Sequence, residues 1–529
     1  MGLSCAEHCQ SNRLSRTATL ALFHLEDLQI MAVEPADSET ASIAYASVEQ
    51  LLKSLDAGDL TCERLMSIYL SRIEGLDQTG PRINAMISLN PQAVLQARAA
   101  DLERKTGTHC GVLHGIPFIV KDNFDVAGMV TSGGSFALRD ATVSSTSTMV
   151  QCLLDQGAIL VGKANMSELA ASCGWLSYSS LGGLTLNPYN TARNVSGSSG
   201  GSAAALAAGF AAFALGTDSS GSIRAPASVT GLVGLRPTQG LIEGCGIIPL
   251  TMSFDTAGPM TRSVRDMVLI LDVIAGPDPT DARPVQPLDS SALKSARLGV
   301  VSNFRGANPE VDHLEQEVLE RLQSAGATLL PIKLPPAFER LWTEVLEPVG
   351  LVEFKPQIER YLKEAGNRTV DSLDALIGLS ESLEALQSET PINPVRLKEL
   401  HRANQANSQK LLTRQAIVDH LIPALRTALI TIFEELRLDA LIFPTLNCPA
   451  SPRFDRHDPS WACNTDDTYK ACYIAAAVGF PEISVPAGRV EANLPVGCSF
   501  LGLPRQERLL LSLAEGFQAI IGHLAPPDL

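Results

Sequence analysis

Glycine and serine gather at two places in one stretch of the chain, Asn194–Pro237, and this stretch most constrains the fold. The first cluster is Ser196–Ser202 and the second is Ser219–Ser222, with an alanine-rich apolar run between them. Glycine allows sharp turns and a close approach of backbone N–H groups to a ligand, while serine hydroxyls can attack or relay a proton. The apolar run has the character of a buried helix. We therefore predict that the stretch forms a functional site.

Length, composition and charge exclude several classes of protein. A chain of 529 residues with 45% hydrophobic and 19% charged residues is typical of a large soluble globular protein, not of a disordered or fibrous one. The formal net charge of −16 argues against nucleic-acid binding, because phosphate recognition requires clustered lysine and arginine. We expect a small or neutral ligand and no nucleic-acid partner.

The cysteines and the N-terminus bear on the compartment. The eleven cysteines are scattered without a CxxC pair, which favours reduced thiols in a cytoplasmic protein over a disulfide framework. The longest apolar run, Ala203–Gly216, is too short to cross a bilayer, so we expect no membrane span. Residues 1–40 lack a signal-peptide pattern and are predicted to be a disordered extension, with Met31 as an alternative start.

Helical periodicity predicts several elements outside the glycine-serine stretch. Ser47 and Gln50 have the spacing of a capping box, so the first folded element is expected to begin there. Further helices are predicted over residues 61–76, 91–105, 263–275 and 308–325, and a strand over 296–301.

A lysine lies near the end of an apolar segment, Ile116–Phe124, which is predicted to be a buried strand. Alternation places Lys121 on the same face as Ile119 and sends Asp122 to the other face. In one interpretation the Lys121 stem lies on the core and its ammonium reaches water or a carboxylate. In the other, burial lowers the pKa of the amine so that it can act as a base.

Two other patterns are set aside. Gly157–Ala164 nearly fits a phosphate-binding loop, but Ala164 stands where that loop needs serine or threonine, and its apolar middle predicts a strand. Nucleotide binding is not expected. Neither HExxH nor CxxC spacing occurs, so we expect no metal.

Four motifs together resemble the amidase signature family of serine hydrolases. They are GIPFIVKD at 115–122, SGSSGGS at 196–202, GTDSSGSIRAPA at 216–227 and VGLRPT at 233–238. The likeness extends from about Ser47 to Gln506 and includes residues 255–260, 439–445, 479–486 and 494–497. It implies one α/β domain over residues 41–529, with a mixed, largely parallel sheet surrounded by helices. A variable helical segment at about 335–414 would shape the substrate pocket.

The resemblance also implies a catalytic triad of the Ser-cisSer-Lys type. The matching positions are Ser222 as nucleophile, Ser198 as the bridging serine and Lys121 as general base. A neutral lysine amine would accept a proton through Ser198 while Ser222 attacks an amide carbonyl and forms an acyl-enzyme. The expected products are an acid and ammonia or an amine. Neither a metal nor an organic cofactor is implied.

The second glycine-serine cluster is expected to stabilise the oxyanion. The resemblance assigns this role to the backbone N–H groups of Ser219, Ser220 and Gly221, with Asp218 and Arg224 supporting the turn. Ser220 stands where the family commonly has glycine, and its side chain is expected to restrict positive φ or narrow the oxyanion hole.

Alternatives to a stand-alone amidase remain open. One is a glutaminase component of the glutamyl-tRNA amidotransferase A type, which works with partner subunits. Another is an inactive binding or scaffold relative, suggested by Ser220. Ser196 also replaces a family glycine. The partner of the amidase would be a small-molecule amide, and a homodimer stays open. Candidate pocket residues are Trp342, Phe354, Tyr361 and Leu376, each of which could equally be an ordinary core residue.

Overall fold

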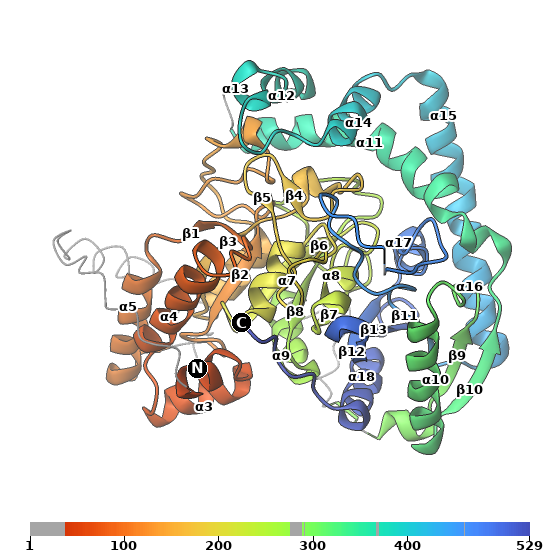
Figure 1. The fold of residues 1–529 in the computed structure, drawn as a ribbon, viewed down its shortest axis with the longest axis horizontal. Helices are drawn as coiled ribbons and strands as arrows, with labels where there is room; N and C mark the ends of the chain where they lie inside the picture. The colour runs from red at the N-terminus through yellow and green to blue at the C-terminus, as the bar shows by residue number, and fades with distance from the viewer. Residues whose placement is uncertain (1–37, 110, 276–287, 290, 367–369, 460) are drawn as a thin grey trace, which may run out of the picture. The chain divides into compact units, whose positions relative to one another are not determined.

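An eleven-stranded mixed sheet runs through the middle of the chain (Figure 1). The computed structural model describes residues 38–529 except 110, 276–287, 290, 367–369 and 460. In their order across the sheet, the strands are β1 (Met86–Leu89), β3 (Ile159–Ala164), β2 (Pro117–Lys121), β6 (Phe213–Asp218), β8 (Thr256–Thr261), β7 (Val233–Arg236), β12 (Glu482–Val490), β13 (Leu494–Leu501), β11 (Ala440–Pro444), β9 (Arg297–Val301) and β10 (Thr328–Ile332).

Parallel pairs lie on the two wings of this sheet. β2 pairs in parallel with β3 and β6, and β9 pairs in parallel with β10 and β11. The strands between the wings, from β6 through β8, β7, β12 and β13 to β11, pair antiparallel, as does β1 with β3. The predicted α/β fold with a mixed sheet is confirmed.

Helices surround the sheet, as predicted (Figure 1). α7 packs against β2 and β6, α9 against β8, and α18 against β12. The α-helices are α2 (Ser38–Ala44), α3 (Val48–Ala57), α4 (Cys62–Arg72), α5 (Ala93–Thr106), α6 (Thr148–Asp155), α7 (Gly200–Ala207), α8 (Arg224–Val229), α9 (Val264–Ala275), α10 (Pro309–Ser324), α11 (Glu347–Glu364), α12 (Leu373–Ser380), α13 (Leu383–Leu386), α14 (Pro394–Asn404), α15 (Ser408–Ala416), α16 (Ile422–Leu436), α17 (Tyr473–Val478) and α18 (Glu507–Ile521).

Local signals explain where several elements begin and end. Ser47 and Gln50 form the predicted capping box at the start of α3. Asn308 caps α10 by accepting the N–H groups of the first turn, where a proline follows it. The first folded element nevertheless begins earlier than expected, because α2 starts at Ser38. The rest of the predicted extension over residues 1–40 lies outside the described residues.

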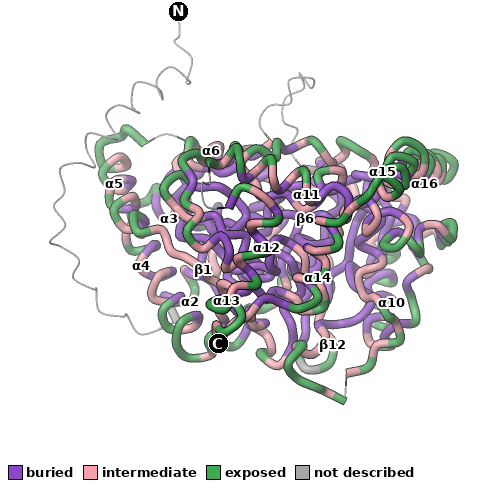
Figure 2. The backbone as a smooth tube through the Cα atoms, turned by 90° about the horizontal axis from the view of Figure 1, so that it is seen from above, coloured by how far each residue is buried: buried purple, intermediate pink, exposed green. Residues whose placement is uncertain are grey.

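The alanine-rich run after the first glycine-serine cluster lies in the main core. Every residue of α7 and β6 is buried, because small side chains let the two elements pack closely against their neighbours. Figure 2 shows this buried centre, with exposed backbone in α5, α15 and α16 at the margin. The two clusters are therefore held on buried, rigid elements.

The segment predicted to be helical at about 335–414 contains α11 to α14 and most of α15. Three of these helices, α11, α12 and α14, contribute to a small hydrophobic core that also includes Leu138, Leu169 and Ile248. The helical stretch Ser408–Leu436 is, among the described residues, the one long and apolar enough by length and composition to cross a membrane. Polar residues interrupt it, so no uninterrupted apolar run in the sequence reveals it. Leu425 and Leu429 of this stretch are buried in a third hydrophobic cluster, separate from the main core and from the small helical core.

One pair of cysteines overturns the expectation of wholly reduced thiols. Cys448 and Cys463 form a disulfide, with their Cα atoms 6.0 Å apart. Such pairing needs Cα atoms within about 4.4–6.8 Å, a condition that the loop between β11 and α17 meets and that sequence spacing cannot reveal. This disulfide does not support the expectation of a reducing compartment.

Candidate active site

Lys121 lies at the end of β2 with its amine inside the protein. The side chain is fully buried, and Nζ donates to Ser198 Oγ at 2.8 Å and to Thr217 Oγ1 at 2.8 Å. Asn123 Nδ2 donates to the same Thr217 hydroxyl at 3.1 Å. The interpretation in which the Lys121 ammonium reaches water or a carboxylate is therefore wrong, since the amine is buried among hydroxyl partners.

Burial lowers the pKa of Lys121 to about 7, because the charged ammonium loses its hydration. The negative charges of Asp218 and Asp255 oppose this shift but do not cancel it. A lysine with this pKa is neutral in an appreciable fraction of molecules near neutral pH. It can then accept a proton, which an ordinary lysine does poorly.

Backbone contacts bring the two glycine-serine clusters together. The peptide bond between Gly197 and Ser198 is cis, and the Ser198 carbonyl accepts the Ser167 N–H at 3.0 Å. The Ser199 N–H donates to the Ser222 carbonyl at 3.2 Å, and Ser222 is 7% exposed. Lys121, Ser198 and the turn that carries Ser222 are thus gathered at one place.

Asp218 fixes the shape of that turn. One of its carboxylate oxygens accepts the Gly221 N–H at 2.8 Å, and Arg224 donates to each oxygen at 3.0 Å. Burial by itself would raise the pKa of Asp218, but the guanidinium groups of Arg224 and Arg236 outweigh it and hold the pKa below its ordinary value. Asp218 is therefore a buried carboxylate, and its contacts fit the supporting role expected for it and for Arg224.

The serine at position 220 is accommodated by the backbone. Gly221 has a φ of +116°, whereas Ser220 is not among the described residues with positive φ. A Cβ atom added to Gly221 would lie 2.8 Å from Cys472 Cβ, so glycine is required at 221. The expected conflict between Ser220 and positive φ therefore does not arise.

Several residues of the site were missed in the sequence. Arg236 donates to the Asp218 carbonyl at 2.6 Å, and Glu482 accepts from Arg224 at 2.6 Å. The Ser219 hydroxyl donates to Asp255, whose pKa is raised by burial and lowered in part by this hydrogen bond. Arg236 and Asp255 lie in segments that carried the resemblance, but no local pattern indicates their partners.

Tyr469, which lies far from both glycine-serine clusters in the sequence, contacts the first cluster at Ser196. Ser196 has a φ of +62°, and its hydroxyl hydrogen-bonds the Tyr469 hydroxyl. Ser177 donates from its hydroxyl to the Ser196 carbonyl at 2.7 Å. The serine that replaces a family glycine therefore has its own partner, one that glycine would lack.

Lys163, from the segment that resembles a phosphate-binding loop, has a structural role. It lies on the buried strand β3, and Nζ is 2.9 Å from Asp122 Oδ1 and 2.6 Å from the Val130 carbonyl. Its amine is therefore occupied, and no loop is available there for a phosphate. Within the described part of the chain, no group of three or more His, Cys, Asp or Glu side chains is placed to hold a metal ion.

A cavity of about 100 Å³ begins at the turn before Ser222. Trp342 and Phe354, two of the candidate pocket residues, line it. Tyr361 instead donates to Asp125 at 2.7 Å, and Leu376 is buried in the small helical core. The full lining is Ala171, Ser219, Ser220, Leu250, Thr251, Phe254, Trp342, Leu346, Glu347, Gly350, Leu351, Phe354, Arg396, Glu399, Arg402 and Ala403.

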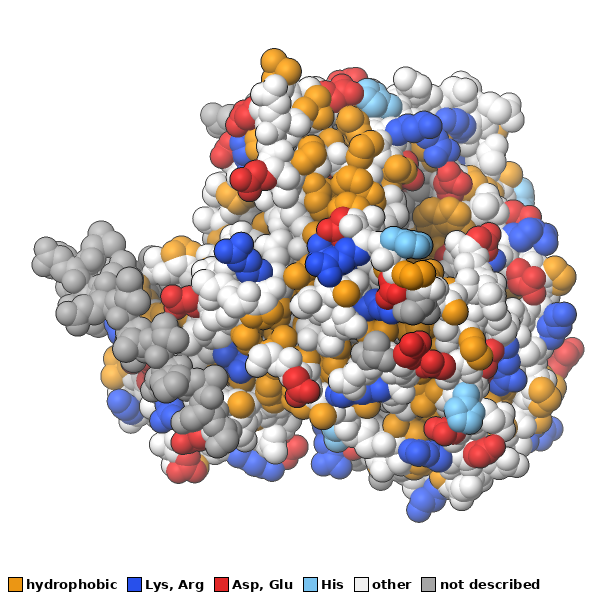
Figure 3. All heavy atoms as spheres, in the orientation of Figure 1, with side chains coloured by type: hydrophobic (Ala, Val, Ile, Leu, Met, Phe, Trp, Pro, Cys, Tyr) orange, Lys and Arg blue, Asp and Glu red, His pale blue; other side chains and the backbone are white. Residues whose placement is uncertain are grey.

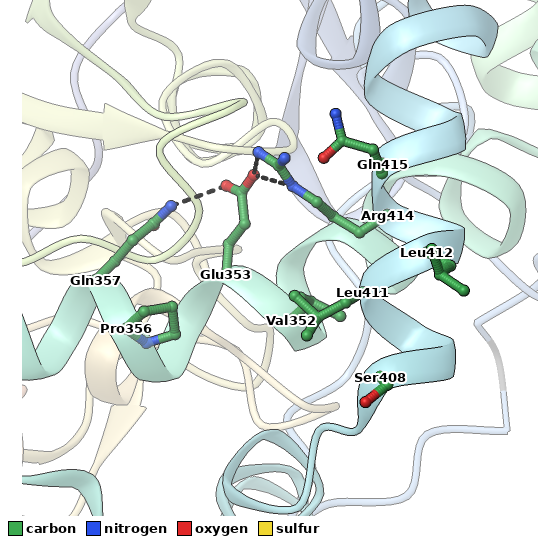
Figure 4. A pocket seen from close by; sticks show the side chains of 9 residues that line it. All are labelled: Val352, Glu353, Pro356, Gln357, Ser408, Leu411, Leu412, Arg414 and Gln415. Carbon is green, nitrogen blue, oxygen red and sulfur yellow. Dashed lines mark hydrogen bonds and ion pairs between the residues drawn. The ribbon is translucent and has the colours of Figure 1, made fainter.

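A larger cavity, of about 590 Å³, lies between α11 and α15 (Figure 4). Glu353 accepts from Arg414 Nε at 2.9 Å and from Gln357 at 2.9 Å, while Leu411 and Leu412 add apolar surface. Size alone would favour this cavity as the binding site. None of its lining residues belongs to the glycine-serine clusters, so we place the candidate active site at the smaller cavity.

Comparison with known proteins agrees with the motifs. The amidase family model matches residues 64–511. A probable amidase of Arabidopsis thaliana is 31% identical, covering 96% of each chain, and the A-type component of the glutamyl-tRNA(Gln) amidotransferase of Deinococcus radiodurans is 31% identical, covering 90% of this chain and 98% of its own. The crystal structure of a peptide amidase from Stenotrophomonas maltophilia is 33% identical with a TM-score of 0.79, covering 92% of this chain and 99% of its own. The chain therefore belongs to the amidase signature family of amide-hydrolysing enzymes.

Proposed function

We propose that this enzyme hydrolyses a carboxylic amide through an acyl-enzyme on Ser222, with Lys121 as general base and Ser198 as proton relay. The observation that carries the proposal is the buried Lys121 amine, 2.8 Å from the Ser198 hydroxyl and with a pKa of about 7. Such an amine can remove a proton near neutral pH without a histidine.

The proposed reaction proceeds in two steps. Ser222 Oγ forms a bond to the amide carbon, its proton passes to Ser198 Oγ, and the Ser198 proton passes to Lys121 Nζ. The C–N bond then breaks, and the leaving nitrogen takes up the proton by the reverse route. Water hydrolyses the acyl-enzyme by the same relay and releases the acid.

Backbone N–H groups of the turn would stabilise the oxyanion. The Gly221 N–H already donates to Asp218, so we assign the oxyanion contacts first to Ser219 and Ser220. Gly221 would contribute mainly the shape of the turn. The loss of one such donor costs roughly 2.7–4 kcal/mol of transition-state stabilisation in related chemistry.

The test is labelling with a fluorophosphonate together with turnover of a simple amide. We expect wild type and the surface control Ser291→Ala to be labelled, while Ser222→Ala is unlabelled and inactive and Lys121→Ala is labelled far more slowly. If Ser222→Ala keeps wild-type turnover, the nucleophile is wrongly assigned. If folded wild type is not labelled, an inactive binding relative becomes the better interpretation.

A glutaminase component of an amidotransferase is the second candidate function, supported by the likeness to the Deinococcus protein. It would predict hydrolysis of glutamine that depends on added partner subunits. A stand-alone amidase predicts turnover of simple amides by the purified chain alone. Assays of both substrates with the single chain separate the two.

A further inference from the structure

The cavity at the active site has an apolar wall close to the reacting turn. Ser219 and Ser220, which precede Ser222 in the turn, belong to its lining. Phe254 and Phe354 belong to the lining and are only 2% and 3% exposed, so they are fixed by the surrounding core. Leu346 and Leu351 extend this surface along α11 and the turn before it. A substrate group lying here would contact hydrocarbon first.

The charges of the cavity are paired with one another. Arg402 donates to Glu347 at 3.0 Å, and Arg396 lies 3.6 Å from Glu399. The Arg396 guanidinium also lies over the Phe354 ring, 5.0 Å from its centroid. Two positive and two negative groups leave no net charge for a charged substrate to meet. A carboxylate or ammonium brought inside would lose hydration without gaining a free counter-charge. On the face of the molecule drawn in Figure 3, cationic and anionic side chains are likewise interspersed.

The size of the cavity limits the group that it accepts. Its volume of about 100 Å³ is below the roughly 150 Å³ of an apolar cavity that holds one benzene ring. It is also well below the roughly 300–1,000 Å³ of pockets for drug-sized ligands. A compact branched group fits this space better than a long chain.

Gly350 of α11 keeps part of this space open. A Cβ atom at position 350 would approach only Thr251 Oγ1, at 3.0 Å, and both residues line the cavity. Glycine is a poor helix former, so its presence inside α11 is not explained by helix propensity. Any larger side chain at 350 would extend into the cavity.

We propose, on the basis of the function proposed above, that this cavity binds the acyl part of the amide and selects compact, uncharged, apolar acyl groups, with Gly350 setting its depth. Isobutyramide is then a better substrate than acetamide, because two further carbons are buried against the Phe254 and Phe354 wall. It is also a better substrate than succinamic acid, whose carboxylate would have to be buried beside arginines that are already paired with glutamates.

The experiment measures kcat/KM for acetamide, isobutyramide and succinamic acid with the full chain. In wild type we expect isobutyramide to exceed acetamide by about tenfold or more. In Gly350→Leu this ratio falls about tenfold, because leucine occupies the acyl space. Gly378→Leu is the matched control, since Gly378 is also helical but has nothing within 4 Å of its Cβ direction and does not line the cavity. That control keeps the wild-type ratio.

Fluorophosphonate labelling of each variant separates the two levels of the proposal. Labelling together with an unchanged isobutyramide-to-acetamide ratio in Gly350→Leu overturns this inference and leaves the proposed function standing. So does a preference of wild type for succinamic acid over isobutyramide. Absence of labelling in folded wild type overturns the proposed function, and this inference with it. If Gly350→Leu does not fold, Gly350→Ala is expected to show a smaller drop in the same ratio, and no drop counts against the inference.

Discussion

The protonation of Lys121 gives a prediction that can be measured directly. Burial brings its pKa to about 7, so the fraction of neutral amine rises about tenfold between pH 6 and pH 8. If the neutral amine is the base, kcat/KM for an amide rises by the same factor and levels off above about pH 8. The assay is ammonia release at low substrate concentration over this range, with correction for any loss of folded enzyme.

A change of one neighbouring charge sharpens the prediction. The negative charge of Asp255 raises the pKa of Lys121, so Asp255→Asn should move the midpoint of the pH profile to lower pH. Asp289→Asn is the matched control at an exposed carboxylate and should leave the midpoint unchanged. A wild-type pH profile with its midpoint near 10, as for an ordinary lysine, would refute the assignment of Lys121 as a base with a lowered pKa. A rate that is flat between pH 6 and pH 8 would refute it as well.

The same shift has a consequence for stability. Between about pH 7 and 10.5 the folded amine is largely neutral, whereas the unfolded amine is protonated. The unfolded state therefore binds more protons. As pH rises through this window, Lys121 raises the free energy of unfolding, so the folded state becomes more stable. Chemical denaturation of wild type and Lys121→Met at pH 7 and pH 9 should show this difference in slope with pH.

Four further perturbations test the turn and the disulfide. Gly221→Ala should lose most activity, because alanine is strained at a φ of +116° and its Cβ would meet the buried Cys472 side chain. Ser220→Gly should stay folded with an unchanged Tm, because Ser220 is not among the described residues with positive φ. Arg224→Met should lower the free energy of unfolding by roughly 3–5 kcal/mol in urea titrations, since it leaves buried Glu482 without its guanidinium partner and Asp218 with Arg236 alone. Reduction of Cys448–Cys463 should lower it by about 3 kcal/mol, the loop-closure value for a separation of this length, and an equal stability of the oxidised and reduced protein would contradict this.

Local sequence determined much of the scaffold. The capping box at Ser47 and the amphipathic pattern of 308–325 predicted α3 and α10, because these signals act within one or two turns of helix. The apolar segment Ile116–Phe124 predicted β2, although the strand stops at Lys121 and does not continue to Phe124. The position proposed for the nucleophile, and that of the glycine turn before it, followed from motif resemblance, since the motif fixes residue types at fixed spacing.

Tertiary structure decided the chemistry of those positions. The pKa of Lys121 depends on burial and on Asp218 and Asp255, which the sheet brings near it from about one hundred or more residues away along the chain. The pairing of Cys448 with Cys463 and the cavity beside Gly350 likewise depend on how distant elements pack. Sequence by itself determined which backbone turns and strands form, because those preferences are local. Only the folded chain determined how far each charge is from water and from other charges, because these distances are set by long-range packing.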